Sequence, residues 1–294
     1  MKKKLVISIV AILVLALISV SLVACSRATT QGQLSNFLVD HQQEIFVYDV
    51  KNEYTNETGT YTVTVTYNTA ATINCPDPIE NVPHGVFVES VLNFGTTEYK
   101  TGCYFTIVNG TALMTPAYTY RIQKENGAET FRMTGSYSGA NFHFEKLVGG
   151  DNASGNLKLS GTYFDNNEFH QSLRTVTTFS TNFNFSFSVP LVSPNETGVV
   201  TLTASCTKTA KVKTAYTDTI SDYAELGVDC YNVRVSRSTK VAGLDHSLYY
   251  ATQPMKASNS QLTMQNVLVK IYEPINTADG TYHMVYSLKS ATIH

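Results

Sequence analysis

The sequence contains no tryptophan and, after residue 24, no block of basic residues, and only 15% of its 294 residues are charged. A basic stripe or a strongly basic domain is the usual signature of nucleic-acid binding, so nucleic acid is not an expected partner. The net charge is −2, and residues 1–24 hold three of the 21 basic residues and no acidic one. The remaining chain is therefore more acidic still. Its single basic cluster, Lys208, Lys211 and Lys213, is typical of a solvated strand edge.

The motifs of metal and nucleophilic chemistry are also missing. None of the five cysteines forms a C-x-x-C pair, and the seven histidines show neither H-x-H nor H-E-x-x-H spacing. Asp245-His246-Ser247 contains the residue types of a hydrolase triad, but adjacent positions on an extended chain cannot converge, and no G-x-S-x-G elbow is present. The sequence thus predicts no catalytic residues, no metal site and no cofactor.

The N-terminus carries the most specific signal in the chain. Met1-Lys2-Lys3-Lys4 precedes an uncharged apolar run over residues 5–24, which ends in Leu22-Val23-Ala24-Cys25. This arrangement resembles a bacterial lipoprotein signal peptide, with a basic start, an apolar segment and a lipobox. The resemblance implies that the chain is cut before Cys25 and that this thiol carries a diacylglycerol with palmitate-type acyl chains.

Two acyl chains anchor a protein stably, whereas a single chain holds it only reversibly. The competing interpretation is an uncleaved transmembrane helix, because the 20 residues of the apolar run are enough to span a bilayer. Both interpretations predict a protein held at the cell membrane, with residues 26–294 on its extracytoplasmic face.

The domain organisation follows from this segment. We expect a signal peptide over residues 1–24, a polar tether over 25–35 and a β domain over 36–294. Pro190 and Pro194 mark the place, near 190–195, where a division of the β domain would fall. Leu34, Phe37, Leu38 and Ile45 follow a loose helical period, which predicts a short helix near 34–44.

Period-two alternation dominates the rest of the chain and predicts half-buried strands. Two segments show it best, with Tyr61, Val63, Val65 and Tyr67 opposite threonines, and Phe183, Phe185, Phe187 and Val189 opposite asparagines and serines. Weaker strands are expected at about 85–94, 98–108, 117–124, 129–137, 140–147, 156–163, 198–207, 228–236, 247–251, 265–273 and 280–289.

Two local signals complete the prediction of an all-β fold. Asn126-Gly127 indicates a tight hairpin, because both residues accept positive φ. Residues 165–176 show a helical period, with Asp165 and Glu168 placed like a capping box. We therefore expect an antiparallel meander that curls into a barrel, half-barrel or sandwich, with one or two short helices.

Four cysteines follow Cys25, namely Cys75, Cys103, Cys206 and Cys230. An extracytoplasmic location permits disulfides, and four cysteines allow three pairings. Cys206 and Cys230 are close in sequence, but strand alternation puts Cys206 on the apolar face of its strand and Cys230 on the polar face of its own. Free thiols, one bridge and two bridges therefore all remain open.

The C-terminal half carries short motifs, Gly227-Val228-Asp229-Cys230-Tyr231-Asn232-Val233, Leu248-Tyr249-Tyr250, Leu268-Val269-Lys270 and Tyr286-Ser287-Leu288. Over about residues 180–290 they resemble exported bacterial β-proteins of unknown function. The layout is also similar, more distantly, to lipoprotein carriers in which a curved antiparallel sheet encloses an acyl chain.

These observations favour a non-enzymatic, lipid-anchored protein that binds a ligand, either a lipid or an exterior protein, through a curved sheet. Five phenylalanines are candidates for lining an apolar cavity, although filling the core is the favoured interpretation of their burial: Phe142, Phe144, Phe183, Phe185 and Phe187. The alternatives are a hydrolase of cell-wall or polymer substrates, which would need two acids in one pocket, and a structural or adhesive surface protein.

Overall fold

A computed structural model describes residues 43–68, 72–73, 79–80, 85–107, 114–175, 180–217, 223–237 and 245–294. All described residues belong to one compact unit. The predicted signal peptide, the tether and most of the helix expected near 34–44 lie outside the described residues.

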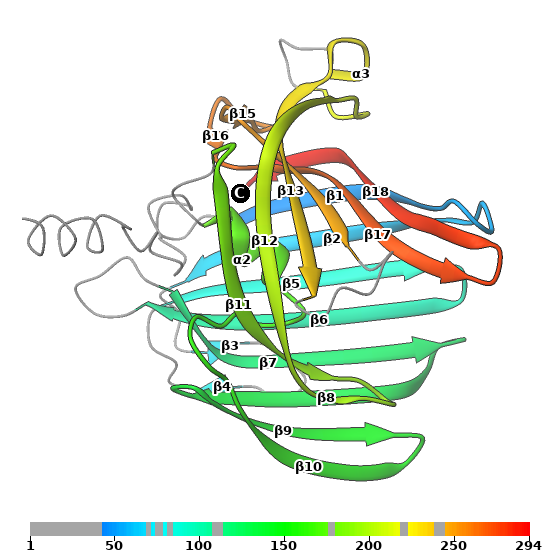
Figure 1. Ribbon diagram of the computed structural model, residues 1–294, viewed down its shortest axis with the longest axis vertical. Helices are drawn as coiled ribbons and strands as arrows, with labels where there is room; N and C mark the ends of the chain where they lie inside the picture. Colours follow the sequence, from blue (N-terminus) through cyan, green and yellow to red (C-terminus); the bar gives the residue numbers. More distant parts are fainter. Residues whose placement is uncertain are drawn as a thin grey trace, which may run out of the picture. The chain divides into compact units, whose positions relative to one another are not determined.

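One 14-stranded antiparallel sheet makes up most of the described chain (Figure 1). In chain order its strands are β1 (Gln43–Asn52), β2 (Thr58–Asn68), β5 (Gly85–Phe94), β6 (Thr97–Ile107), β7 (Met114–Glu125), β8 (Ala128–Ser138), β9 (Asn141–Val148), β10 (Asp151–Lys158), β11 (Phe183–Val192), β12 (Thr197–Val212), β13 (Val228–Arg237), β14 (His246–Ala251), β17 (Leu268–Thr277) and β18 (Gly280–Ile293). The smaller elements are β3 (Thr72–Ile73) with β4 (Ile79–Glu80), β15 (Met255–Lys256) with β16 (Thr263–Met264), and the helices α2 (Phe169–Arg174) and α3 (Tyr223–Leu226). None of the described helices is long and apolar enough to cross a membrane.

The sheet curls into a nearly closed barrel. Its order is β10-β9-β8-β7-β6-β5-β2-β1-β18-β17-β14-β13-β12-β11, so each strand lies beside its neighbours along the chain and β18 lies beside β1. Gln43 and His294 exchange two backbone hydrogen bonds of 2.9 Å, which join the C-terminal strand to β1. The predicted all-β antiparallel meander with short helices is confirmed, and of the three forms left open the barrel is the one adopted.

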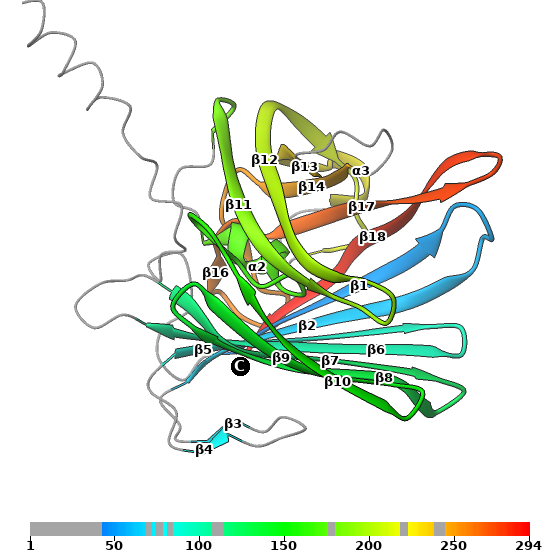
Figure 2. The same cartoon turned by 60° about the horizontal axis from the view of Figure 1, so that its bottom comes forward.

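The ring is interrupted between β10 and β11, where the connecting segment turns inward. Tyr163 forms a parallel bridge with Ser188 of β11. The Phe164 amide donates to the Ser188 carbonyl at 3.0 Å, and the Ser188 amide donates to the Thr162 carbonyl at 2.8 Å. The chain then enters the barrel as α2, which both views place within the curve of the sheet (Figures 1 and 2).

Alternation places the core as the sequence predicts. Val63 and Val65 of β2 are buried, whereas the threonines between them lie on the opposite face. In β11, Phe183, Phe185 and Phe187 are buried and the residues between them are exposed. Asn126 and Gly127 have φ of 51° and 79°, which confirms the hairpin between β7 and β8.

The structure corrects the bounds of three local predictions. Ile45 belongs to strand β1, which begins at Gln43, so the helix predicted near 34–44 does not extend into it. The strand expected at 156–163 is β10, Asp151–Lys158, because Gly149 and Gly150 both take positive φ and close the turn just before it. The helix expected over 165–176 is shorter, and Glu168 at its N-cap makes no side-chain capping bond.

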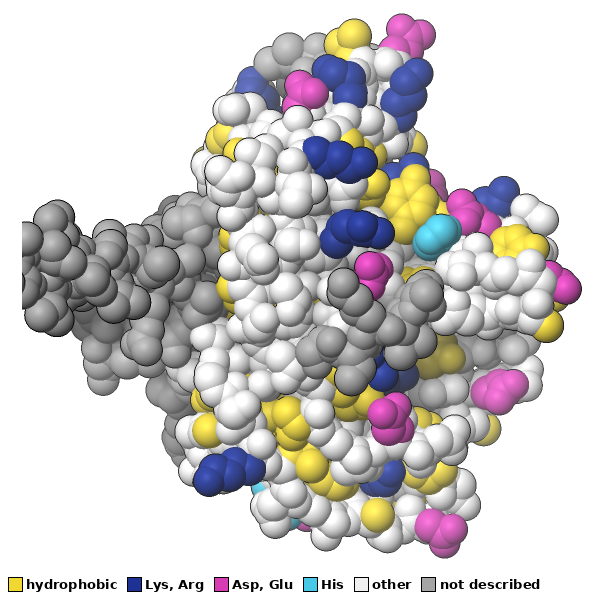
Figure 3. All heavy atoms as spheres, viewed as in Figure 1, with side chains coloured by type: hydrophobic (Ala, Val, Ile, Leu, Met, Phe, Trp, Pro, Cys, Tyr) yellow, Lys and Arg dark blue, Asp and Glu magenta, His cyan; other side chains and the backbone are white. Residues whose placement is uncertain are grey.

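The lysine cluster follows Cys206, the last residue of β12 that pairs with β11. Figure 3 shows several Lys and Arg side chains on the upper part of the surface. Lys208, Lys211 and Lys213 are exposed, and β11 pairs with β12 only as far as Cys206. Among the described residues, this end of β12 therefore pairs with β13 alone and is a solvated edge, as predicted.

Three cysteines are buried free thiols, namely Cys103, Cys206 and Cys230. Cys206 lies opposite Val233 and Cys230 opposite Ala210, so the two do not face each other. Burial raises the pKa of all three thiols, which disfavours the reactive thiolate. Cys25 and Cys75 lie outside the described residues.

Candidate functional site

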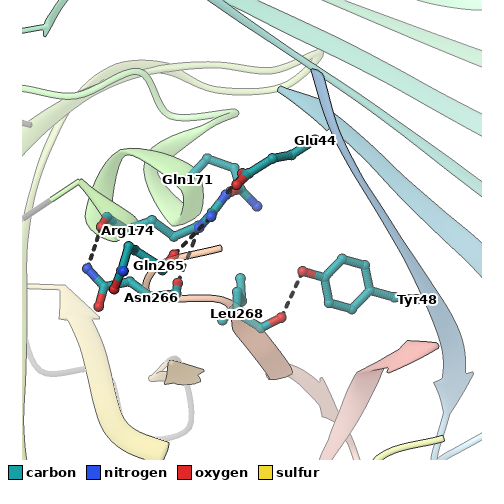
Figure 4. Close-up of polar contacts among 7 residues, drawn as sticks. All are labelled: Glu44, Tyr48, Gln171, Arg174, Gln265, Asn266 and Leu268. Atoms are coloured by element: carbon teal, nitrogen blue, oxygen red, sulfur yellow. Dashed lines mark hydrogen bonds and ion pairs between the residues drawn. The ribbon is translucent and has the colours of Figure 1, made fainter. Parts of the chain in front are cut away.

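Helix α2 and the residues before it form an inner layer against the barrel wall, held by a buried ion pair (Figure 4). An Nη of Arg174 lies 2.9 Å from the Glu44 carboxylate of β1, and both side chains are 2% exposed. The guanidinium also donates to the carbonyls of Gln265 at 3.0 Å and Asn266 at 3.2 Å, and to Gln171 Oε1 at 3.3 Å. A buried ion pair needs such additional partners to offset its desolvation.

A second contact joins the start of α2 to strands β5 and β6. The Thr101 hydroxyl donates to Glu168 Oε1 at 2.6 Å, and the Ser90 hydroxyl lies 3.1 Å from both carboxylate oxygens. Glu168 is 1% exposed. Burial raises its pKa from 4.5 to about 8, although the hydrogen bonds from Thr101 and Ser90 oppose the shift. The carboxyl is therefore mostly neutral at pH 7.

Asp165 lies close by and is equally buried. Its carboxylate accepts hydrogen bonds from the Tyr137 hydroxyl at 2.7 Å and from the Asn167 amide at 2.9 Å. Burial raises its pKa from 3.8 to about 6, against the effect of these hydrogen bonds. The two carboxyl groups fasten the inner segment to β5, β6 and β8.

A cavity of about 510 Å³ lies beside this inner layer. Strands on both sides of the barrel contribute to it, together with residues 166–170. Its apolar walls include Leu92, Phe169, Leu191, Ile271, Ile275 and Met284, with the rings of Tyr61, Tyr99 and Tyr286. Its ionisable side chains are Arg121, Arg237, His170, His246 and Glu273.

His170 and His246 form a pair in the cavity wall, with ring centroids 5.8 Å apart. His170 lies on α2 and His246 begins β14. The Nε2 atom of His170 and the Nδ1 atom of His246 are buried without a hydrogen-bond partner among the described residues. Burial, and to a lesser degree the His246 ring, lowers the pKa of His170 to about 3, and burial also lowers that of His246. Both rings are therefore neutral at pH 7.

The two arginines of the cavity make no ion pair or side-chain hydrogen bond with the described part of the chain. The Arg121 guanidinium packs on two rings instead, 5.8 Å from the Tyr99 centroid and 5.7 Å from that of Phe131. Burial lowers its pKa. Glu273, the single carboxylate among the lining residues, accepts a hydrogen bond of 2.8 Å from the Tyr286 hydroxyl.

A smaller recess of about 70 Å³ adjoins this cavity. The two share Asn166, Phe169, Leu191, Arg237 and His246. The remaining walls of the recess are apolar, formed by Val189, Val200, Leu202 and Val235. An apolar pocket therefore lies directly beside Arg237 and His246.

The five phenylalanines proposed from the sequence lie in two separate clusters. Phe142 and Phe144 are buried with Phe131 and Met133, whereas Phe183, Phe185 and Phe187 belong to the larger core. None of the five is among the lining residues of the 510 Å³ cavity. Inside the described chain, no three His, Cys, Asp or Glu side chains gather as metal ligands.

Sequence reasoning missed the residues of this cavity. The sequence draws attention to His246 only through the triplet Asp245-His246-Ser247. In the structure the side chains of the first two point apart, since His246 lines the cavity and Asp245 lies 3.8 Å from Arg234. Arg121 and Arg237 stand 116 positions apart in the numbering, on β7 and β13, and no local pattern links them.

Comparison with known proteins gives the fold and nothing more. No family model matches the sequence, and no curated protein matches it either. The barrel is similar to the crystal structure of a β-barrel-like protein of domain of unknown function DUF1849 from Brucella abortus, with a TM-score of 0.51 and 10% identity. The similarity covers 87% of this chain and all of that one. At this identity it supports the barrel architecture alone.

Proposed function

We propose that this protein binds an amphipathic small molecule in the barrel cavity while a lipid anchor on Cys25 holds it at the extracytoplasmic face of the cell membrane. The cavity is the observation that carries the binding role. Its volume of about 510 Å³ falls within the 300–1,000 Å³ typical of small-molecule sites, and its lining combines apolar walls with a few polar groups.

Binding is better supported by this cavity than hydrolysis. Glycoside hydrolysis uses two carboxyl groups facing one substrate, and the cavity lining supplies one, Glu273. Glu168 contacts Ser90 and Thr101, which line the cavity, but is not itself a lining residue.

The binding role is tested by native mass spectrometry of the purified protein, followed by extraction of bound material with organic solvent. Met284→Trp is expected to reduce bound small molecule, because Met284 lines the cavity and the larger side chain would occupy its volume. Leu262→Trp is the matched control, since Leu262 is 49% exposed and lies outside the lining. A wild-type protein that neither carries nor takes up any amphipathic molecule would instead favour a structural or adhesive role.

The anchor is tested by labelling with radioactive palmitate. Cys25→Ser should abolish incorporation of label and leave an uncut precursor, because the resemblance of residues 22–25 to a lipobox implies that this thiol is the acceptor. Cys75→Ser is expected to label normally. Undiminished labelling of the Cys25 variant would contradict the anchor without bearing on the cavity.

A further inference from the structure

The charges that line the cavity do not balance. Arg121 and Arg237 are cationic, Glu273 is the one carboxylate among the lining residues, and both histidines are neutral at pH 7. The lining therefore carries one net positive charge. In a partly desolvated site an unmatched charge is costly, and a bound group of opposite charge would offset that cost.

Arg121 has no ion-pair partner within 4 Å in the described part of the chain. The rings of Tyr99 and Phe131 flank its guanidinium, and Glu273 acts on it only from a longer distance, where its charge partly opposes the lowering of the Arg121 pKa by burial. A restricted guanidinium loses little further freedom when it binds, and its planar donors suit both oxygens of a carboxylate.

Arg237 stands beside neutral hydrogen-bond donors. Arg237 and His246 line both the cavity and the adjoining recess. Neutral imidazoles can donate one N–H each, and His170 and His246 both retain a buried ring nitrogen without a described partner. The amide side chains of Asn166 and Asn167 line the same cavity.

Apolar surface adjoins these donors. The recess of about 70 Å³ adjoins the wall that contains Arg237 and His246, and its other lining side chains are apolar except for Asn166. A ligand with an anionic group at the arginines would therefore place a hydrocarbon portion against Ile271 and Met284 or in the recess.

We propose that the ligand is an amphiphile with a single negative charge, of the monocarboxylate class, and that Arg121 and Arg237 select its charged group. This inference rests on the proposed binding role and specifies its chemistry. One negative charge neutralises the lining, whereas a doubly charged group such as a phosphate monoester leaves one charge unmatched.

Isothermal titration of the full-length protein at pH 7.5 with decanoate and decan-1-ol tests the selection, since the two probes share a tail and differ in charge. Decanoate should bind at least about tenfold more tightly, as expected for hydrogen bonds to a charged group. Arg121→Gln and Arg237→Gln should each weaken decanoate binding about tenfold and leave decan-1-ol unchanged, and the double variant should bind both probes alike.

Two control variants show whether weaker binding in the glutamine variants reflects the lost charge or a misfolded protein. Arg121→Lys keeps the charge and should keep the preference for decanoate. Arg234→Gln removes a charge from the outer face of β13, where the side chain is 65% exposed, and should change nothing. Equal affinities for the two probes, or a preference that survives in the double variant, would overturn the inference and leave the binding role standing. Binding of neither probe to the wild-type protein would overturn both.

Discussion

Replacing Glu168 by glutamine is expected to stabilise the barrel, and to do so increasingly as the pH rises from 5 to 8. Glu168 is 1% exposed and its carboxyl group contacts the hydroxyls of Ser90 and Thr101. Burial is the main reason that its pKa rises from 4.5 to about 8. Glutamine has nearly the same shape, stays neutral at every pH and can still hydrogen-bond to both hydroxyls.

The magnitude follows from proton linkage. The folded state holds the Glu168 proton more tightly than the unfolded state, so this group favours folding most below pH 4.5, and stability falls as the pH rises toward 8. The slope over that window is about 1.4 kcal/mol per pH unit. Between pH 4.5 and pH 7 the free energy of unfolding of the wild-type protein should therefore fall by roughly 3 kcal/mol, whereas that of the glutamine variant should not show this loss.

Urea denaturation at pH 5, 6, 7 and 8 measures the difference, provided that the denaturant slope m is unchanged. Asp165→Asn is the matched control. The pKa of Asp165 is raised from 3.8 to about 6, so this substitution should alter the pH dependence below pH 6 and not between 6 and 8. If the Glu168→Gln variant gains no stability relative to wild type between pH 5 and pH 8, the conclusion that the Glu168 carboxyl group is mostly neutral at pH 7 is wrong.

Two further substitutions test the packing of the inner layer and the core. Arg174→Met should cost about 3–5 kcal/mol, because it leaves the buried Glu44 carboxylate unpaired, and adding Glu44→Met should restore much of the loss in thermal or urea denaturation. Phe185→Ala should lower the free energy of unfolding by about 3–5 kcal/mol, because its ring packs in the main core. Asn184→Ala on the exposed face should change it by less than about 0.5 kcal/mol. Equal effects of the two substitutions would contradict the assigned faces of β11.

The strand pattern was predictable wherever one face of a strand is apolar and the other polar. β2 and β11 follow that rule through most of their length, and the sequence placed their inward faces correctly. β1 breaks it, because the buried face of this strand begins with Glu44. Its partner Arg174 lies 130 residues along the chain, so no local window could show that a carboxylate belongs inside.

The prediction of a capping box was wrong for a related reason. Asp165 and Glu168 have the spacing of a capping box, and in isolation such side chains would serve the helix N-terminus. Glu168 instead binds Ser90 and Thr101 of the barrel wall. Asp165 keeps a local hydrogen bond from the Asn167 amide but also accepts one from Tyr137 of the wall. The tertiary partners compete with the local cap, and they lie at least 28 residues away.

The inner layer explains how a cavity with polar groups can persist inside a barrel. Glu168 fastens residues 165–174 to β5 and β6, and Arg174 fastens them to β1 on another side. The Tyr250 hydroxyl donates to the His170 carbonyl at 2.7 Å, which adds a third attachment from β14. A segment held at three points cannot easily collapse into the space beside it, and His170 is thereby fixed in the cavity wall. Of the three attachments, the ion pair between Glu44 and Arg174 costs the most desolvation, and its stability depends on the additional hydrogen bonds that the guanidinium makes.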